Sequence, residues 1–307
     1  MNDQADNLRK AIARLGALRV QESAAGAQTK RAAGPARVIT VTSGKGGVGK
    51  TSVSVNLALA LGELNYRPLI IDADVGLSNV EVLFGLIPKY SLLDAVNNEK
   101  SIREIICDGP GGVKLISGGS GADVFARVAE TQMAALLSEI SDIDGEFDVI
   151  IIDTGAGISE TVIGMAVAAD EAIVVTTPEP TSVTDAYALI KAIVLRDRDK
   201  TVRLIINKAD NEREAVEIMS KLDQVTDKFL DLKLHKLGYI LNDPLAVRSV
   251  KQQQPFLLAS PHSQISKKVR EIARCLLDGA TFAPAEKGRG LAGFLGGITK
   301  FVNMQLK

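Results

Sequence analysis

The chain has 307 residues, a formal net charge of −1 at pH 7, 46% hydrophobic residues and 24% charged residues. This composition is typical of a soluble globular protein and excludes a global electrostatic attraction to nucleic acid or to an anionic membrane. The two cysteines, Cys107 and Cys275, have no metal-ligand spacing, which favours a reduced cytoplasmic protein. No apolar run reaches the roughly eighteen residues that a membrane span needs, and no secretion signal is predicted.

The N-terminal part of the chain is predicted to contain a helix and a linker. A short amphipathic helix is expected over 3–19, because four apolar residues recur on one face: Ala5, Leu8, Ile12 and Leu15. Residues 20–36 have no hydrophobic periodicity, so we expect a flexible linker there.

From residue 37 to residue 277 the sequence alternates between strand and helix patterns. Apolar strands are predicted over 38–43, 68–72, 113–117, 147–153, 171–177, 202–207 and 236–241. Helices are predicted over 51–64, 92–96, 130–141, 159–168, 182–196, 212–229, 244–251 and 262–277. Continuous apolar strands are buried on both faces, so the pattern predicts an α/β domain: a doubly wound, mostly parallel sheet with helices on both faces. Ligands of such domains bind at the carboxyl ends of the strands.

A glycine-rich loop follows the first of these strands. The pattern Gly44-x-x-x-x-Gly49-Lys50-Thr51 is that of a phosphate-binding loop, in which backbone N–H groups and Lys50 hold phosphates and Thr51 holds Mg²⁺. Lys45 adds a second cation that phosphate binding within one chain does not require, so we expect it to act across a dimer. The residues predicted to contact a nucleoside triphosphate in this loop are Gly44, Lys45, Gly46, Gly47, Val48, Gly49, Lys50, Thr51 and Ser52.

Three aspartates end two further predicted strands. Asp72 and Asp74 follow one apolar run, and such a pair can contribute to a Mg²⁺ shell and, through Asp74, position or deprotonate the attacking water. Asp153 ends the apolar run that starts at Phe147, the Walker-B pattern, in which the carboxylate reaches Mg²⁺ through water. We therefore predict Thr51, Asp72 and Asp153 as the Mg²⁺ site.

Asn207 ends another predicted strand and offers both a donor and an acceptor to a purine edge. Two alternatives remain open for this turn. Asn207 can be a plain strand-end residue, and guanine recognition by Asp210 competes with adenine recognition.

The C-terminal residues are predicted to form a linker over 278–289 and an amphipathic helix over 290–307. The four glycines of this segment are expected to weaken the helix, each by about 1 kcal/mol relative to alanine. A single apolar stripe is formed by Leu291, Phe294, Leu295, Ile298, Phe301 and Val302. Two interpretations of this stripe stay open: it is a membrane-targeting surface, or in a monomer it folds back onto the α/β domain.

Together, the Lys45–Thr51 loop, the Asp72-Ala-Asp74 pair and Asp153 resemble the deviant Walker-A ATPases of the MinD/ParA type over about 37–277. Segments 72–80, 111–116, 179–191 and 225–230 are similar to the FlhG family (also called FleN or YlxH), MinD-like ATPases that control flagellar number and placement. The N-terminal residues resemble that family's activator motif for the GTPase FlhF, and the matching positions are Asp3, Gln4, Ala5, Leu8 and Arg9.

This resemblance implies an ATP-dependent homodimer in which Lys45 reaches the phosphates of the partner copy. It also implies adenine contact by Asn207, Mg²⁺ bound through Thr51 and Asp153, and Asp74 beside the attacking water. The implied location is the cytoplasm, with the protein bound peripherally to the cytoplasmic face of the inner membrane. A position at the cell pole is left open. Implied partners are an FlhF-type GTPase, membrane lipids, and flagellar switch (C-ring) components or a flagellar transcription regulator.

Two other functions compete with this interpretation. The first is a MinD/ParA-like ATPase that places the cell-division site or partitions DNA or other cargo. Binding of DNA would need a basic surface, and the one candidate surface in the sequence consists of Lys191, Arg196, Arg198, Lys200 and Arg203. No specific nucleic acid partner is expected. An iron–sulfur carrier of the same ATPase superfamily would need a Cys-x-x-Cys motif, which two isolated cysteines do not supply.

Overall fold

The computed structural model describes residues 35–74, 79–119, 139–140, 143–278 and 290–305. Several predicted segments lie outside the described residues: the helix over 3–19, the linker over 20–36 apart from its last two residues, and the linker over 279–289. The predicted helix over 130–141 is also outside them, except for residues 139 and 140.

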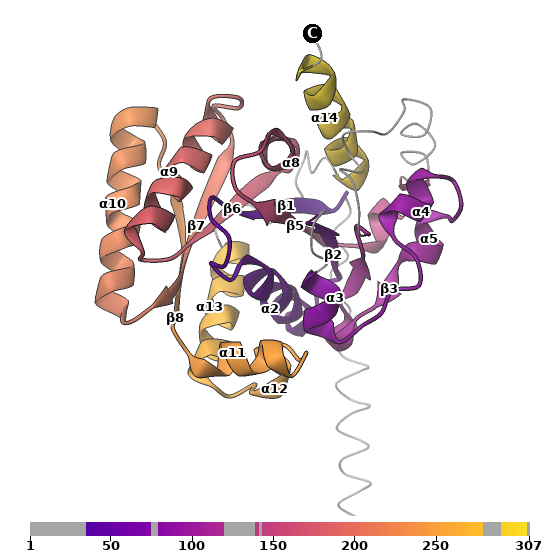
Figure 1. Cartoon of the computed structure of the whole chain (residues 1–307), viewed down its shortest axis with the longest axis horizontal. Coiled ribbons are helices and arrows are strands. Elements are labelled where there is room, and N and C mark those ends of the chain that lie inside the picture. The colour runs from indigo at the N-terminus through magenta and orange to yellow at the C-terminus, as the bar shows by residue number, and fades with distance from the viewer. Residues whose placement is uncertain (1–34, 75–78, 120–138, 141–142, 279–289, 306–307) are drawn as a thin grey trace, which may run out of the picture. The chain divides into compact units, whose positions relative to one another are not determined.

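The described residues contain one eight-stranded sheet with the order β3-β4-β2-β5-β1-β6-β7-β8 (Figure 1). All neighbouring strands are parallel except the edge pair β3 and β4. The doubly wound α/β prediction is therefore confirmed. The strand bounds are β1 (Arg37–Ser43), β2 (Pro68–Ala73), β3 (Cys107–Asp108), β4 (Lys114–Ile116), β5 (Val149–Ala156), β6 (Glu171–Thr176), β7 (Thr201–Ala209) and β8 (His235–Leu241).

The central strands are apolar on both faces because each face meets its own core. Ile151 packs in a core on one side of the sheet, whereas its neighbours Ile150 and Ile152 pack in a core on the other side. All three side chains are fully buried. Because side chains alternate between two cores, a parallel strand covered by helices on both faces has a continuous run of apolar residues in its sequence.

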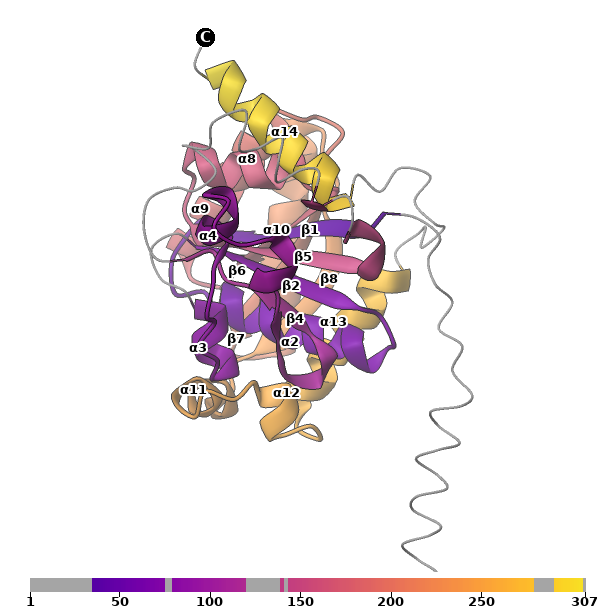
Figure 2. The ribbon, with the colours of Figure 1, turned by 90° about the vertical axis from the view of Figure 1, so that its right-hand side faces the viewer.

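Helices cover both faces of the sheet (Figure 2). Residues of α2, α3, α12 and α13 belong to the core on one face, and those of α4, α5, α8, α9, α10 and α14 belong to cores on the other. The helix bounds are α2 (Lys50–Glu63), α3 (Asn79–Phe84), α4 (Leu92–Val96), α5 (Ile102–Ile105), η1 (Pro110–Gly112), η2 (Asp144–Glu146), α8 (Glu160–Ala168), α9 (Pro180–Val194), α10 (Glu212–Leu230), α11 (Pro244–Lys251), α12 (Phe256–Ala259), α13 (Gln264–Asp278) and α14 (Gly290–Gln305).

The elements missing from the sequence prediction are short: α3, α5, α12, β3 and the two 3-10 turns. One of them had a recognisable signal. Ser101 and Glu104 form a capping box, in which each side chain bonds to the backbone N–H of the other residue. The S-x-x-E pattern of Ser101–Glu104 is therefore a sequence signal for the start of α5 at Ile102.

The C-terminal apolar stripe is buried in this structure. Leu291, Phe294, Leu295, Ile298 and Phe301 are between 1% and 7% exposed, and α14 packs along α8. The glycines, expected only to weaken the helix, also permit this contact: a Cβ at Gly297 would lie 3.0 Å from the Cβ of Ala168. The side chain of Val302 lies outside the described residues. No helix in the described part of the chain is long and apolar enough to cross a membrane.

Candidate functional site

The predicted phosphate loop joins the end of β1 to the start of α2. Gly49 has φ +88, a left-handed conformation that glycine adopts without steric cost, and a Cβ there would lie 2.4 Å from the side-chain nitrogen of Asn207. Gly44 is equally constrained, because a Cβ at that position would lie 2.3 Å from the carbonyl oxygen of Asp185 in α9. Gly44 and Gly49 are therefore required by close approach, and Gly49 also by turn geometry.

Two side chains from the end of β7 hold the loop from outside. The amide of Asn207 donates to the carbonyl of Val48 at 2.7 Å, and the amine of Lys208 donates to the carbonyl of Gly47 at 2.7 Å. These two hydrogen bonds fix the loop carbonyls on the β7 side, which leaves the N–H groups of the loop available to bind phosphate. Asn207 is thus placed at the loop, and its predicted contact with adenine stays a prediction.

Lys50, Asp153 and Ser54 form a buried cluster beneath the loop. The Lys50 amine lies 3.2 Å from Asp153 Oδ1, and the Ser54 hydroxyl donates to the same oxygen at 2.7 Å. Lys50 is 7% exposed and Asp153 is completely buried. The sequence analysis missed Ser54, although its position one helical turn after Lys50 places both side chains on one face of α2.

Asp72 lies beside Asp153 because β2 and β5 are neighbours and these two residues are in register. The Asp72 carboxylate accepts the backbone N–H of Asp74 at 3.1 Å and that of Val80 at 3.0 Å. Burial, together with the nearby Asp153 carboxylate, raises the pKa of Asp72 to about 7. Asp72 therefore also shapes the start of α3, a role that its predicted place in a Mg²⁺ shell did not include.

The donor set fits a hydrated magnesium ion. Asp153 Oδ2 is buried and has no hydrogen-bond partner among the described residues, and Thr51 is half-buried in the first turn of α2. In the described part of the chain, no group of three or more His, Cys, Asp or Glu side chains could hold a metal by itself. Mg²⁺ is usually bound through one or two protein ligands, waters and substrate phosphates, which matches Thr51 and Asp153 at the end of a phosphate loop.

Asp74 lies on the chain that leaves β2, at the same end of the sheet. It is half-buried, its carboxylate is 3.4 Å from the side-chain nitrogen of Asn79, and a Cβ at Gly155 would lie 3.5 Å from its Oδ1. The structure therefore places Asp74 next to the residues that follow Asp153. Its predicted role at the attacking water stays a prediction.

Comparisons with known proteins identify the family to which this fold belongs. A model of the ParA family, described as "NUBPL iron-transfer P-loop NTPase", matches residues 35–277. The antiactivator FleN of Pseudomonas aeruginosa is 43% identical over 78% of this chain and 86% of its own length. The flagellum site-determining protein YlxH of Helicobacter pylori is 34% identical over 88% of this chain and 92% of its own length.

The chain belongs to the FlhG (FleN/YlxH) branch of the MinD/ParA family of P-loop ATPases. It is therefore an ATPase, as the family resemblance implied. The septum site-determining protein MinD of Pyrococcus horikoshii, solved with Mg-ADP, superposes with a TM-score of 0.65 at 24% identity. That match covers 82% of this chain and the whole of that chain, and it shows the shared fold.

In this FlhG-type ATPase the second lysine of the loop has partners within its own chain. The amine of Lys45 bonds to Glu179 Oε2 at 2.8 Å and to the hydroxyl of Thr181 at 2.9 Å. Glu179 precedes Pro180 at the start of α9, and no sequence signal connected it to the loop. The predicted activator residues Asp3, Gln4, Ala5, Leu8 and Arg9 lie outside the described residues.

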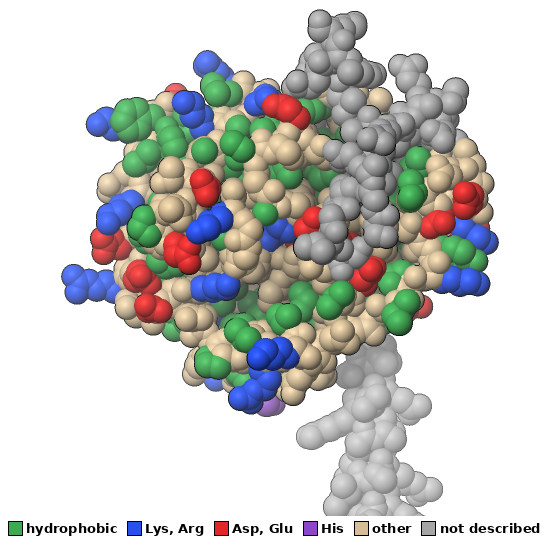
Figure 3. Space-filling view, in the orientation of Figure 1, with side chains coloured by type: hydrophobic (Ala, Val, Ile, Leu, Met, Phe, Trp, Pro, Cys, Tyr) green, Lys and Arg blue, Asp and Glu red, His purple; other side chains and the backbone are tan. Residues whose placement is uncertain are grey.

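Two of the five cations in the candidate basic patch of residues 191–203 are buried within the domain. Arg203 is 5% exposed and pairs with Glu171, and Lys200 is 5% exposed and donates to the carbonyls of Val167 and Ala169. On the face shown in Figure 3, basic and acidic side chains intermix over α9 and α10. The observation on which the DNA-partitioning alternative depended is thus missing for two of its five cations.

Proposed function

We propose that this protein is an ATP-dependent dimerising switch that regulates the number and placement of flagella. The chain is an ATPase, and it belongs to the branch of the family whose relatives include FleN and the flagellum site-determining protein YlxH. The single structural observation that carries the proposal is the cluster of Lys50, Ser54 and Asp153 under a phosphate loop that also contains Lys45. One of the two lysines in this loop can bind the phosphates within its own chain, and the other is then available to bind the phosphates held by a second copy.

The proposed reaction is hydrolysis of ATP with Mg²⁺. Lys50 and the loop N–H groups bind the β- and γ-phosphates. Thr51 and Asp153 would hold the Mg²⁺ ion, which would supply positive charge next to the phosphate oxygens. Asp74 positions or deprotonates the attacking water. Lys45 of one copy contacts the phosphates of the other, so that binding of ATP favours the dimer. Asn207 contacts the adenine.

Membrane attachment in this proposal depends on release of α14. The apolar stripe that would enter the bilayer interface is buried against the domain, so a membrane-bound state must first separate α14 from α8. Six apolar residues contribute roughly 1 kcal/mol each when partly buried at the interface, and the cations near the stripe are few. One copy binds weakly, whereas two copies in an ATP dimer gain avidity of about 10² or more.

The N-terminal residues 1–19 supply the proposed link to the flagellar system. The motif that includes Gln4 and Arg9 stimulates an FlhF-type GTPase, and flagellar switch components or a transcription regulator bind the ATP dimer. These partners are proposed from the sequence resemblance to the activator motif and from the names of the relatives. The proposed location is the cytoplasmic face of the inner membrane.

The test is genetic, in the host that encodes the chain. Deleting the gene should change the number or position of flagella per cell, counted by electron microscopy, and the wild-type gene should restore both. Lys50→Ala should fail to restore them, whereas the matched surface substitution Lys221→Ala should restore them fully. Unchanged flagellar number and position in the deletion strain would refute the proposed function.

A further inference from the structure

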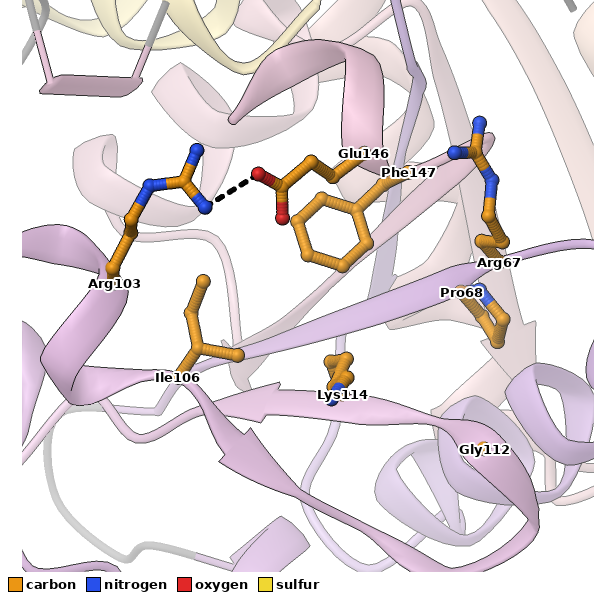
Figure 4. Close-up of a pocket in the computed structure, with 8 residues that line it drawn as sticks. All are labelled: Arg67, Pro68, Arg103, Ile106, Gly112, Lys114, Glu146 and Phe147. Carbon is orange, nitrogen blue, oxygen red and sulfur yellow. Dashed lines mark ion pairs between the residues drawn. The ribbon is translucent and has the colours of Figure 1, made fainter. Parts of the chain in front are cut away.

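A cavity of ≈ 330 Å³ lies at the end of the sheet opposite to the phosphate loop (Figure 4). Pro68 begins β2, Lys114 begins β4, and Phe147 comes just before β5, and all three line the cavity. Asp72 and Asp153 lie near the other ends of β2 and β5. A strand of six residues spans roughly 20 Å, so this cavity is separate from the nucleotide site.

The cavity combines an apolar floor with cationic walls. The floor consists of Pro68, Ile106 and Phe147, and Figure 4 shows Ile106 and the Phe147 ring on either side of one space. Three cations line the cavity: Arg67 just before β2, Arg103 in α5 and Lys114 in β4. Glu146 is the one acid among the described residues that line it. This is the usual arrangement of a ligand pocket, in which a few polar groups orient a mostly apolar body.

The three cations differ in how firmly they are held. Arg67 is fixed, because its guanidinium donates to Asp148 at 2.7 and 3.0 Å and its backbone N–H donates to Asp148 at 2.9 Å. The side-chain bonds raise the pKa of Arg67. The ion pairs of Arg103 with Glu146 and of Lys114 with Asp108 lie at the surface, where such pairs contribute little stability. The side chain of Asp108 is 85% exposed and does not line the cavity. A bound anion can therefore replace these carboxylates as the partner of Lys114 and Arg103.

We propose that this cavity binds a small organic anion. Its apolar body packs on Ile106, Pro68 and Phe147, and its phosphate or carboxylate group lies between Lys114 and Arg103. The volume is at the lower end of the range of ligand pockets, which favours a small molecule over a protein segment. The proposal also gives a role to segment 111–116, which the nucleotide site does not use.

The wall of the cavity rests on the helix of the nucleotide site. A Cβ at Gly111 in η1 would lie 2.7 Å from Cδ2 of Leu59 in α2, so η1 and α2 are in close contact. The first turn of α2 contains Lys50 and Thr51. The anion would therefore bind next to the far end of the helix that holds the nucleotide phosphates.

The test uses phenyl phosphate as the probe, titrated calorimetrically into the full chain with the phosphate loop saturated by ADP and Mg²⁺. Wild type should bind the probe, and Lys114→Glu should weaken binding by about tenfold or more, since a charge-assisted hydrogen bond becomes a repulsion. Lys114→Arg should keep the affinity. Lys221→Glu, which reverses a surface lysine paired with Glu217 on α10, should bind like wild type.

Two further probes separate the anion site from the apolar floor. Inorganic phosphate lacks the apolar body and benzyl alcohol lacks the charge, so each should bind more weakly than phenyl phosphate. The proposal is overturned if wild type fails to bind phenyl phosphate, if Lys114→Glu binds it as well as wild type does, or if inorganic phosphate binds equally well. These outcomes are independent of flagellar phenotype and of ATP turnover.

Discussion

Lys45 of the phosphate loop and Glu179 at the start of α9 form an ion pair of 2.8 Å within one chain, although 134 residues separate them. The hydrogen bond from Lys45 lowers the pKa of Glu179. Both side chains are substantially exposed, at 38% and 66%, so the pair is weak and Lys45 is able to exchange partners. The proposed contact of Lys45 with a second copy therefore competes with a contact that already exists in one chain.

We expect Lys50→Ala and Lys45→Ala to fail at different steps. Lys50→Ala should abolish ATP binding, because the remaining backbone donors do not neutralise the charge of the β- and γ-phosphates. Lys45→Ala should retain nucleotide binding and lose both ATP-linked dimerisation and hydrolysis. Fluorescent-nucleotide titration and size-exclusion chromatography with ATP measure the two steps.

Glu179→Gln is the control for the Lys45 prediction. It removes the carboxylate that pairs with Lys45 within the chain and leaves the lysine available, so ATP-linked dimerisation should be kept. If Lys45→Ala still dimerises with ATP as wild type does, the role of this lysine across the dimer is wrong.

Asp74→Ala should separate hydrolysis from binding. Asp74 lies outside the buried cluster of Lys50 and Asp153, so its removal leaves the phosphate contacts intact. Turnover should fall by roughly 10²-fold or more, the usual effect of losing a group that positions or accepts a proton. Size-exclusion chromatography with ATP and Mg²⁺ should show a trapped dimer. Normal phosphate release by this variant would exclude Asp74 from that role.

Packing of α14 on α8 offers a way to release the helix without changing its apolar stripe. A Cβ at Gly164 would lie 2.8 Å from Cδ1 of Phe301, so Gly164→Val should displace Phe301. Overpacking of this kind costs about 1–3 kcal/mol, and we expect Gly164→Val to bind anionic vesicles about tenfold better than wild type in ADP. Vesicle co-sedimentation measures the bound fraction.

Phe294→Glu provides the opposite case. It also disturbs the packing of α14, because Phe294 is 1% exposed, but it places a charge in the stripe that would contact lipid. This variant should therefore stay unbound in both ADP and ATP, whereas wild type should gain binding with ATP. Equal sedimentation of all three proteins in both nucleotides would show that α14 is not a nucleotide-gated anchor.

Glu171 is buried between two arginines at the start of β6 and should be important for stability. It forms ion pairs with Arg37 and Arg203, and it is 9% exposed. Burial lowers the pKa of Arg37, which shows how costly the charge would be without its partner. Glu171→Ala should lower the free energy of unfolding by about 3–5 kcal/mol, because the buried guanidinium of Arg203 and the half-buried guanidinium of Arg37 lose the carboxylate that they share.

Urea unfolding followed by circular dichroism checks this value. Glu217→Ala removes an exposed ion pair with Lys221 on α10 and should change the free energy of unfolding by no more than about 0.5 kcal/mol. Similar urea midpoints for the two variants would contradict the importance of the buried cluster.

A peptide of residues 1–20 should raise the GTP hydrolysis of an FlhF-type GTPase, and Gln4→Ala should weaken the effect. The full chain without residues 1–20 should keep its own ATPase activity, because the phosphate loop and its supports lie entirely between residues 43 and 208. Phosphate release from GTP, with and without the peptide or the shortened chain, measures the stimulation, and phosphate release from ATP by the shortened chain alone measures its own activity. Stimulation of the GTPase by the shortened chain would place the activating contact elsewhere.

Much of the fold was predictable because it depends on short-range patterns. The strand that ends at Asp153 is a continuous apolar run, and the helix after Lys50 follows directly from the glycine loop, so both were expected within one to three residues of their observed bounds. Small elements such as α5 were missed because four residues carry little periodicity. The family resemblance rested on the same local motifs and is confirmed.

The sequence by itself determined the class of enzyme, a P-loop ATPase, because the motifs that contain Lys50, Thr51 and Asp153 each occupy a few adjacent positions. The roles of these three residues stay predictions. Only the tertiary structure decided which residues these motifs meet. The strand order places Asp72 opposite Asp153 and brings Glu179 to Lys45, and neither contact follows from spacing along the chain. The stripe of α14 shows the same limit. An apolar helix face can enter a bilayer or a protein core. In this structure it enters the core, where Gly164 and Ala168 on α8 are small enough for close approach.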